Sequence, residues 1–172
     1  MNSKMKTITR LVDGRVSKKR IINLNSWKRR KAVRAVIWND LNKMPLLWSN
    51  KYKFHKIPGG GIEKGEVMKK ALKREIMEEV GVKIKTIRFL GIIEEYWTEN
   101  KYFQKSWCFT AKINKIVKAP KYTEEEKLVD MQLKWYDKSE VLKVMYNDEA
   151  IGIEHKVINL RDYLILENIL KK

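Results

Sequence analysis

The feature that most constrains this chain is a glycine-rich loop that runs directly into a short helical segment. The loop, KIPGGGIEKGE, contains Gly59, Gly60, Gly61 and Gly65. Glycine lets a backbone adopt positive φ and approach a ligand closely. The residues from about Val67 to Glu79 have helical periodicity, and Gly81 suits the left-handed position that follows a helix end. The sequence therefore predicts a loop suited to ligand binding that leads into one helix.

Three glutamates of this helix share one face. Glu78 and Glu79 lie roughly 60° behind and 40° ahead of Glu75 at about 100° per residue, and like charges at this spacing repel by roughly 0.2–0.5 kcal/mol per pair. A solvated acidic face is the alternative, but the apolar Ala71 and Leu72 lie beside the same face. Carboxylates turned toward the body of a protein need a partner, and Mg²⁺ can bind several at once. We therefore expect a metal site on this face.

Length and composition favour one domain with a sizeable core, because the chain has 172 residues and is 44% hydrophobic. No apolar run is long enough to span a bilayer, and the basic N-terminus is not followed by the apolar stretch of a signal peptide. We expect a soluble, cytoplasmic protein without a membrane contact. The single cysteine, Cys108, excludes an internal disulfide and a cysteine-rich zinc site.

Positive charge is concentrated at the N-terminal end. The net charge is +17, and residues 1–34 contain twelve Lys or Arg against Asp13 alone, so this first fifth carries +11 of it. Two interpretations stay open: compositional drift in a chain rich in Lys, Ile and Asn, and a contact with a polyanion such as RNA.

The chain predicts a mixed α/β layered domain, with strands around one internal helix and helices at the end. Asp13-Gly14, between short β-prone runs, favours a hairpin within a basic N-terminal extension over residues 1–30. The rest, residues 31–172, is predicted as the folded domain. Strands are expected within residues 31–40, 44–50, 84–97, 103–113 and 128–136, a polar loop over 120–127, and closing helices within 138–147 and 157–172.

From Gly60 to Val82 the sequence follows the pattern G-x5-E-x7-R-E-U-x-E-E-x-G-U, in which U is apolar. This pattern resembles the Nudix box in full, and the likeness extends from about Lys31 to the C-terminus. The resemblance implies a Nudix-type α/β/α sandwich around a mixed β-sheet. It also implies hydrolysis of a nucleoside diphosphate linked to another moiety, with Mg²⁺ or Mn²⁺, and it makes a homodimer a further expectation.

The resemblance also assigns roles to residues of the box. It implies that Glu75, Glu78 and Glu79 bind the metal, and that Gly59, just before the box, offers a carbonyl ligand. Gly60 and Gly61 are expected to let the backbone approach the substrate. Glu66 and Arg74 are expected to support the loop and the ligands, although a helix-terminal acid and a surface ion pair are the ordinary alternatives.

Three residues outside the box are further candidates. Glu126 fits the family's pattern of an acid nine residues before a tryptophan, here Trp135, and is the predicted general base. Glu95 is expected to face the substrate if alternate residues of its strand point to the site. His55 stands where the family often has an aromatic residue, and either contacts the substrate or is structural.

The leading functional prediction is hydrolysis of a nucleoside triphosphate or a modified nucleotide. One alternative is a pyrophosphohydrolase of RNA 5′ ends that holds RNA on the basic N-terminal arm. Another is a binding module that does not hydrolyse, which is opposed by the retention of every acid of the box. An isomerase of isoprenoid diphosphates would need a reactive Cys108, which lies in an apolar strand.

Overall fold

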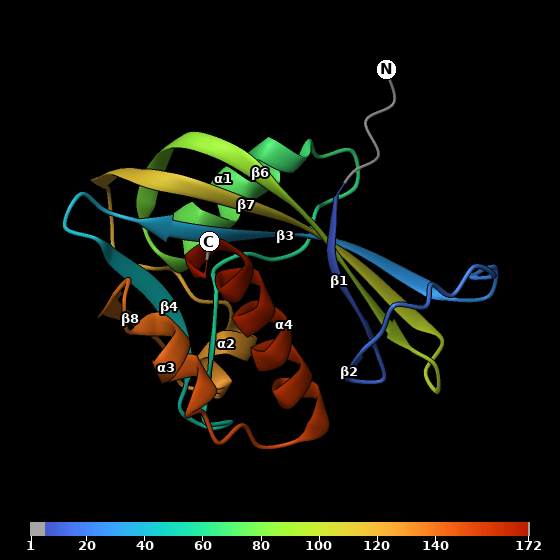
Figure 1. Cartoon of the computed structure of the whole chain (residues 1–172). Coiled ribbons are helices and arrows are strands. Elements are labelled where there is room, and N and C mark those ends of the chain that lie inside the picture. The colour runs from blue at the N-terminus through green and yellow to red at the C-terminus, as the bar shows by residue number, and fades with distance from the viewer. Residues whose placement is uncertain (1–5, 172) are drawn as a thin grey trace.

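The computed structural model describes residues 6–171, in which two β-sheets lie between helices (Figure 1). The larger sheet has the strand order β2-β1-β6-β7-β3. Its strands are β1 (Thr7–Val12), β2 (Arg15–Val16), β3 (Lys28–Trp38), β6 (Val82–Trp97) and β7 (Tyr102–Ile116). The sheet is mixed, because β1 pairs with β6 and β3 with β7 in parallel, whereas β6 and β7 are antiparallel.

The smaller sheet places the start of the glycine loop. In it, β4 (Lys43–Ser49) pairs antiparallel with both β5 (Phe54–Lys56) and β8 (Met131–Asp137). The loop leaves the end of β5 and runs along β3 of the larger sheet. There, the Val33 N–H donates to the Gly60 carbonyl at 2.9 Å, and the Ala35 N–H to the Pro58 carbonyl at 3.0 Å. The loop is therefore fixed by both sheets.

The helices lie on the two faces of the larger sheet, with α1 (Met68–Glu79) on one side and α4 (Ile153–Leu170) on the other (Figure 1). Alternating side chains of β3 fill the two resulting cores. Val33, Ala35 and Ile37 share a core with α1, whereas Val36 shares one with α4 and with α3 (Val141–Tyr146). This confirms the α/β/α sandwich around a mixed sheet. Within residues 6–171, no helix has the length and apolar character needed to cross a bilayer.

Two elements differ from the sequence-based expectations. The last helix begins at Ile153 rather than at Val157, directly after Gly152 with its φ of 86°. The polar loop expected over 120–127 is wrong for its second half, which forms the short helix α2 (Glu124–Leu128). The reason is a capping box: the Thr123 hydroxyl accepts the Glu126 N–H at 3.2 Å, and the Glu126 carboxylate accepts the Thr123 N–H at 2.9 Å.

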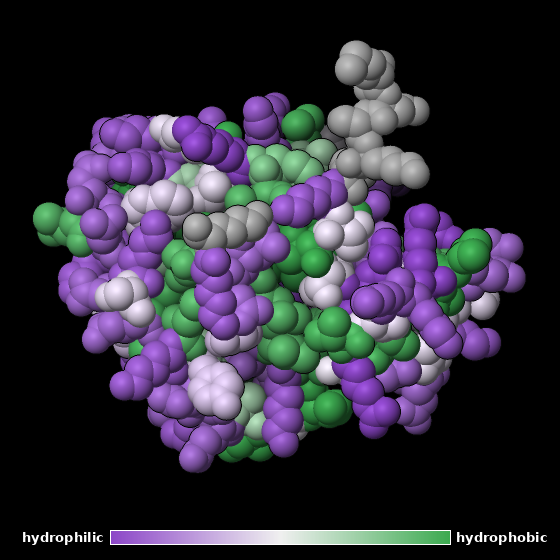
Figure 2. All heavy atoms as spheres, viewed as in Figure 1, coloured by the Kyte–Doolittle hydropathy of each residue, from purple (hydrophilic) through white to green (hydrophobic). Residues whose placement is uncertain are grey.

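The described part of the N-terminal segment joins the larger sheet. β1 and β2 pair around Asp13 and Gly14, and β1 lies along the second half of β6. The beginning of β3 and the hairpin between β6 and β7 project beyond α4 (Figure 1), and Figure 2 shows that hydrophilic residues cover most of this projection. The division into an extension at 1–30 and a domain at 31–172 stays a prediction.

Candidate active site

Two neighbouring glycines of the loop are required for different reasons. Gly59 has a φ of 135°, and a Cβ at this position would clash with the Val33 carbonyl oxygen. Gly60 has no left-handed φ, but a Cβ there would lie 2.6 Å from Cδ of Glu75. Gly59 is thus required by the backbone of β3, whereas Gly60 leaves space for the carboxylate of α1.

Arg74 connects the glutamates of α1 to the loop. Its guanidinium donates two hydrogen bonds to Glu66, at 3.0 and 2.9 Å, and one to the Gly61 carbonyl at 3.0 Å. It also donates to Glu75 at 2.9 Å and to Glu78 at 3.2 Å. The bonds to Glu66 and Glu75 outweigh the effect of burial and raise the pKa of Arg74, and the bond from Arg74 lowers the pKa of Glu66. The structure therefore brings these predicted site residues together.

Glu79 lies at the other side of the same face and is buried. Its carboxylate accepts the Gly59 N–H at 2.6 Å and contacts the Lys56 ammonium at 3.1 Å. Lys56 Nζ also lies 3.5 Å from Oε1 of Glu126, so the predicted general base is one side chain away from the acidic face of α1. The other oxygen of Glu126 accepts hydrogen bonds from Thr123 and thereby fixes the carboxylate.

The oxygen atoms that α1 and the glycine loop present together fit a hard divalent cation. Glu75, Glu78 and Glu79 offer carboxylate oxygens and Gly59 a carbonyl oxygen, the ligand type that Mg²⁺ prefers. Burial raises the pKa of Glu75 and of Glu79 despite their cationic neighbours, so further positive charge would stabilise their ionised forms. Among the described residues no three acidic, His or Cys side chains already converge on a metal position. A metal cation would therefore compete with the Arg74 guanidinium and the Lys56 ammonium for these carboxylates.

His55 does not take part in this cluster. It is buried, and its Nδ1 lies 2.8 Å from Asp148 while its Nε2 lies 2.8 Å from the Tyr136 hydroxyl. Its backbone N–H also donates to Asp148, at 2.6 Å. Both ring nitrogens are therefore engaged within the protein, which favours the structural interpretation of this histidine over a substrate contact.

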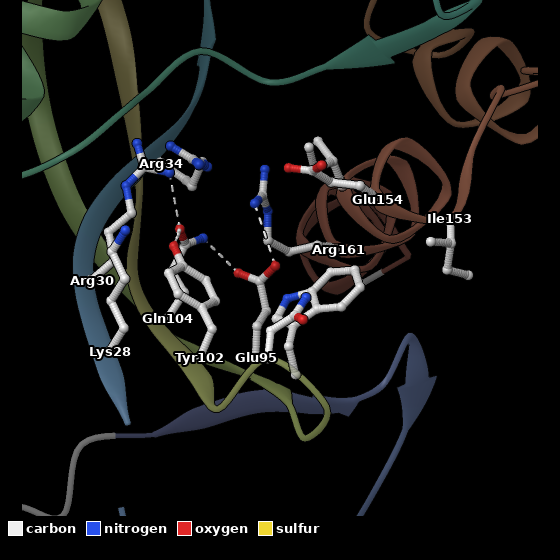
Figure 3. Close-up of a pocket in the computed structure, with 12 residues that line it drawn as sticks. Lys28, Arg30, Arg34, Glu95, Tyr102, Gln104, Ile153, Glu154 and Arg161 are labelled. Atoms are coloured by element: carbon white, nitrogen blue, oxygen red, sulfur yellow. Dashed lines mark hydrogen bonds and ion pairs between the residues drawn. The ribbon is translucent and has the colours of Figure 1, made fainter. Parts of the chain in front are cut away.

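A pocket of about 580 Å³ opens beside the loop, between β3, the β6–β7 hairpin and the beginning of α4 (Figure 3). Glu95 lines it, and its carboxylate accepts a hydrogen bond from Gln104 at 2.7 Å and lies 3.5 Å from Arg161. Gln104 in turn accepts from Arg30 at 3.1 Å. Glu95 therefore anchors a polar chain that holds guanidinium groups on opposite walls of the pocket, as Figure 3 shows.

Sequence reasoning missed the basic residues of the site. Arg30 and Arg34 are four residues apart in β3 and both line the pocket. The signal was available, because a charged residue at position 34 interrupts the apolar run of a strand that is otherwise buried. Lys56 follows His55 at the end of β5 and points to Glu79, and the sequence contains no comparable signal for it.

A glycine loop and an acidic helix face beside a basic pocket define a class of phosphate-binding α/β domain. The chain belongs to the NUDIX domain family, whose model matches residues 28–155. The match runs from the start of β3 into α4 and includes every site residue predicted from the sequence.

Comparison with individual proteins gives shorter matches. The RNA pyrophosphohydrolase of Blochmanniella pennsylvanica (strain BPEN) is 38% identical over 63 residues, which are 35% of this chain and 39% of that protein. The 8-oxo-dGTP diphosphatase of Buchnera aphidicola subsp. Acyrthosiphon pisum (strain APS) is 39% identical over 72 residues, 38% of this chain and 58% of that protein. These matches thus span only part of either relative. The crystal structure of a MutT NUDIX hydrolase from Burkholderia pseudomallei supports the fold, with a TM-score of 0.57 and 18% identity over 83% of this chain and 98% of that one.

Proposed function

We propose that this chain hydrolyses a pyrophosphate bond in a nucleoside diphosphate linked to another moiety, with Mg²⁺ or Mn²⁺ as cofactor. The observation that carries the proposal is the acidic face of α1 against the glycine loop. Glu75 lies beside Gly60, Glu79 accepts a hydrogen bond from Gly59, and Glu78 lies next to them with its side chain 45% exposed. Membership of the NUDIX family supports the same reaction.

In this proposal each residue has a separate task. The three glutamates and the Gly59 carbonyl hold the cation, which neutralises phosphate charge and makes the phosphorus more susceptible to attack. Arg74 fixes the orientation of Glu75 and Glu78 relative to the loop. Glu126 accepts the proton of the attacking water, a role supported by its place beside the acidic face of α1, since Lys56 Nζ lies 3.1 Å from Glu79 and 3.5 Å from Glu126.

We propose a free nucleotide, either a nucleoside triphosphate or a modified nucleotide, as the substrate. The pocket has the volume of a small-molecule site, for which about 300–1,000 Å³ is usual. Trp97 and Tyr102 line it and offer surfaces on which a base can stack, while Arg30 lies next to Gly61 of the loop. The relative named 8-oxo-dGTP diphosphatase supports this choice.

A second candidate substrate is the 5′ end of RNA, and the projecting strand ends favour it. Lys18, Lys19 and Arg20 are exposed in the segment between β2 and β3, and Lys28 and Arg29 are exposed at the start of β3. Lys28 also lines the pocket, so the basic surface is continuous with the proposed nucleotide site. The relative named RNA pyrophosphohydrolase is consistent with this alternative.

The test is a substrate panel with product identification by chromatography, run with Mg²⁺ and with EDTA. The panel contains canonical and oxidised nucleoside triphosphates, dinucleoside polyphosphates, ADP-ribose, NADH and 5′-triphosphorylated RNA. Wild type is compared with Glu79→Gln and with Glu124→Gln, a matched control, because Glu124 is an exposed acid of α2 whose carboxylate pairs with Lys127. We expect metal-dependent hydrolysis that falls by orders of magnitude only in Glu79→Gln.

The RNA alternative needs its own variant. Deleting residues 1–30 would remove β1 and the start of β3, so a loss of activity would not report on RNA contact. Replacing Lys18, Lys19 and Arg20 with Gln keeps both strands. A steep, salt-dependent loss of activity on RNA but not on mononucleotides would support the alternative. If wild type binds nucleotide or RNA but cleaves nothing in the panel, the non-hydrolytic module becomes the better account.

A further inference from the structure

Arg34 is a buried guanidinium whose charge is poorly compensated. Its side chain is 5% exposed, and Nη1 donates to the carbonyl of its own neighbour, Val33, at 3.0 Å. Its Nε is buried without a hydrogen-bond partner among the described residues. Burial and the like charge of Arg161 lower the pKa of Arg34 to about 10. An unmade hydrogen bond at a buried charged group is costly, so such a group calls for a role.

The carboxylates near Arg34 are already paired elsewhere. Asp162 accepts a hydrogen bond from Arg161 at 2.7 Å and another from the Ile57 N–H at 3.0 Å. Glu95 accepts from Gln104 and lies beside Arg161. The protein therefore keeps Arg34 buried next to acids that are committed to other donors, which leaves Nε without an acceptor among the described residues.

The position of Arg34 indicates which anion this is. The backbone on either side of it is hydrogen-bonded to the loop, through Val33 to Gly60 and through Ala35 to Pro58. This brings the Arg34 Cα against Gly59, the candidate carbonyl ligand of the metal. The side chain lines the pocket proposed for the nucleoside, where Figure 3 shows it near Arg30. Arg34 thus lies between the acidic face of α1 and the nucleoside pocket.

We propose that Arg34 binds the 5′-phosphate of the nucleotide, the phosphate attached directly to the nucleoside. The inference rests on the proposed function, because it takes the pocket as the nucleoside site. A phosphate in this position would accept hydrogen bonds from two N–H groups of one guanidinium, a geometry that arginine provides and lysine does not. Arg34 would then fix the orientation of the substrate, with the nucleoside in the pocket and the remaining phosphates toward α1.

The experiment measures equilibrium binding in EDTA, so that no metal contributes. The probes are the four 5′-ribonucleoside monophosphates and the corresponding nucleosides, titrated by calorimetry. The proteins are wild type, Arg34→Met, Arg34→Lys and the control Arg88→Met, since Arg88 is an exposed arginine of β6 outside the pocket.

For Arg34→Met, we expect monophosphate binding to weaken by about 10- to 100-fold, as for the loss of a charge-assisted hydrogen bond, with nucleoside binding unchanged. Arg34→Lys should weaken monophosphate binding less than Arg34→Met does, and Arg88→Met should match wild type. The ligand-free melting temperature of Arg34→Met should equal or exceed that of wild type, because a poorly compensated buried charge is removed. A purely structural arginine would instead lower it.

Several results would overturn the inference. These are equal binding of monophosphate and nucleoside by wild type, unchanged monophosphate binding in Arg34→Met, or a parallel loss of nucleoside binding. If Arg34→Met does not fold, the NMR resonance of the Arg34 Nε–H in wild type is measured instead, and it is assigned by its absence from the spectrum of Arg34→Lys. A shift with monophosphate but not with nucleoside supports the inference, and no shift refutes it.

The two proposals can fail separately. Hydrolysis of the substrate panel together with intact phosphate binding in Arg34→Met would refute only the role of Arg34. Phosphate binding that depends on Arg34, without hydrolysis of any member of the panel, would refute the proposed function.

Discussion

Substituting Gly60 by Ala should separate activity from stability at this site. The backbone of Gly60 has no left-handed φ, so alanine can adopt it without strain. The new Cβ would lie 2.6 Å from Cδ of Glu75, whereas ordinary van der Waals contact begins at 3.4 Å. The carboxylate must therefore retreat by at least about 0.8 Å, the difference between these two distances, because one of its oxygens lies still nearer to the new Cβ than Cδ does.

The expected magnitudes follow from this displacement. Moving Glu75 weakens its 2.9 Å hydrogen bond with Arg74, at a cost of about 1–2 kcal/mol, and part of this is offset by the lower entropy of the unfolded chain with alanine. The free energy of unfolding should therefore change by about 1 kcal/mol or less. If Glu75 is a metal ligand as proposed, its displacement by close to 1 Å should lower hydrolysis by about 100-fold.

The assay compares Gly60→Ala with Gly61→Ala in metal-dependent hydrolysis and in urea unfolding. A Cβ on Gly61 would meet Nη2 of Arg30 at 3.6 Å, an ordinary contact, so this variant should match wild type in urea unfolding. The reasoning is refuted if Gly60→Ala is folded and retains activity within about threefold of wild type, because Glu75 would then tolerate displacement. It is also refuted if Gly60→Ala fails to fold.

Three further predictions concern buried groups. Burial raises the pKa of Glu79 in the folded protein above its ordinary value of 4.5, so the folded state loses stability relative to the unfolded state as pH rises above 4.5. Glu79→Gln should therefore raise the melting temperature in EDTA at neutral pH, and this gain should vanish below pH 4.5. Burial raises the pKa of Cys108 to about 12, so the native thiol should resist iodoacetamide and Cys108→Ala should retain hydrolysis. The isomerase alternative predicts instead that wild type ignores nucleotides and that its activity on isoprenoid diphosphates is lost when Cys108 is replaced. His55→Leu removes the imidazole partner of Asp148 and of the Tyr136 hydroxyl, although Asp148 keeps the hydrogen bonds from the backbone N–H of residue 55 and from Asn159. It should cost about 1–3 kcal/mol in urea unfolding, with KM unchanged; a raised KM would indicate a substrate contact.

Much of the fold could be predicted because local signals and packing agree. The side chains of the strand expected at 31–40 point alternately to the core beneath α1 and to the core beneath α4. Gly81, with a φ of 74°, follows the end of α1 as expected. α2 was missed because its five residues have no buried face, so hydrophobic periodicity could not indicate it. The capping box that forms it depends only on Thr123 and Glu126, a spacing that is easily read as a polar loop.

The site was predictable where it is local and was missed where it depends on distant segments. Glu75, Glu78 and Glu79 share one helix face, so their spacing was sufficient to group them. Lys56 meets Glu79 and Glu126 only because β5, α1 and α2 converge, which no local pattern encodes. Likewise, the pocket is lined by arginines of β3 and of α4. These two elements are far apart in the sequence, so no local pattern indicated that their basic residues meet.

The central claim is that the acidic face of α1 binds the divalent cation on which hydrolysis depends. The most direct measurement is a titration with Mn²⁺, in which the free ion is quantified by electron paramagnetic resonance for wild type, Glu79→Gln and Glu124→Gln. The account predicts saturable binding in wild type and in Glu124→Gln, and its loss in Glu79→Gln together with hydrolysis. Mn²⁺ binding of wild-type strength in a folded Glu79→Gln would contradict it.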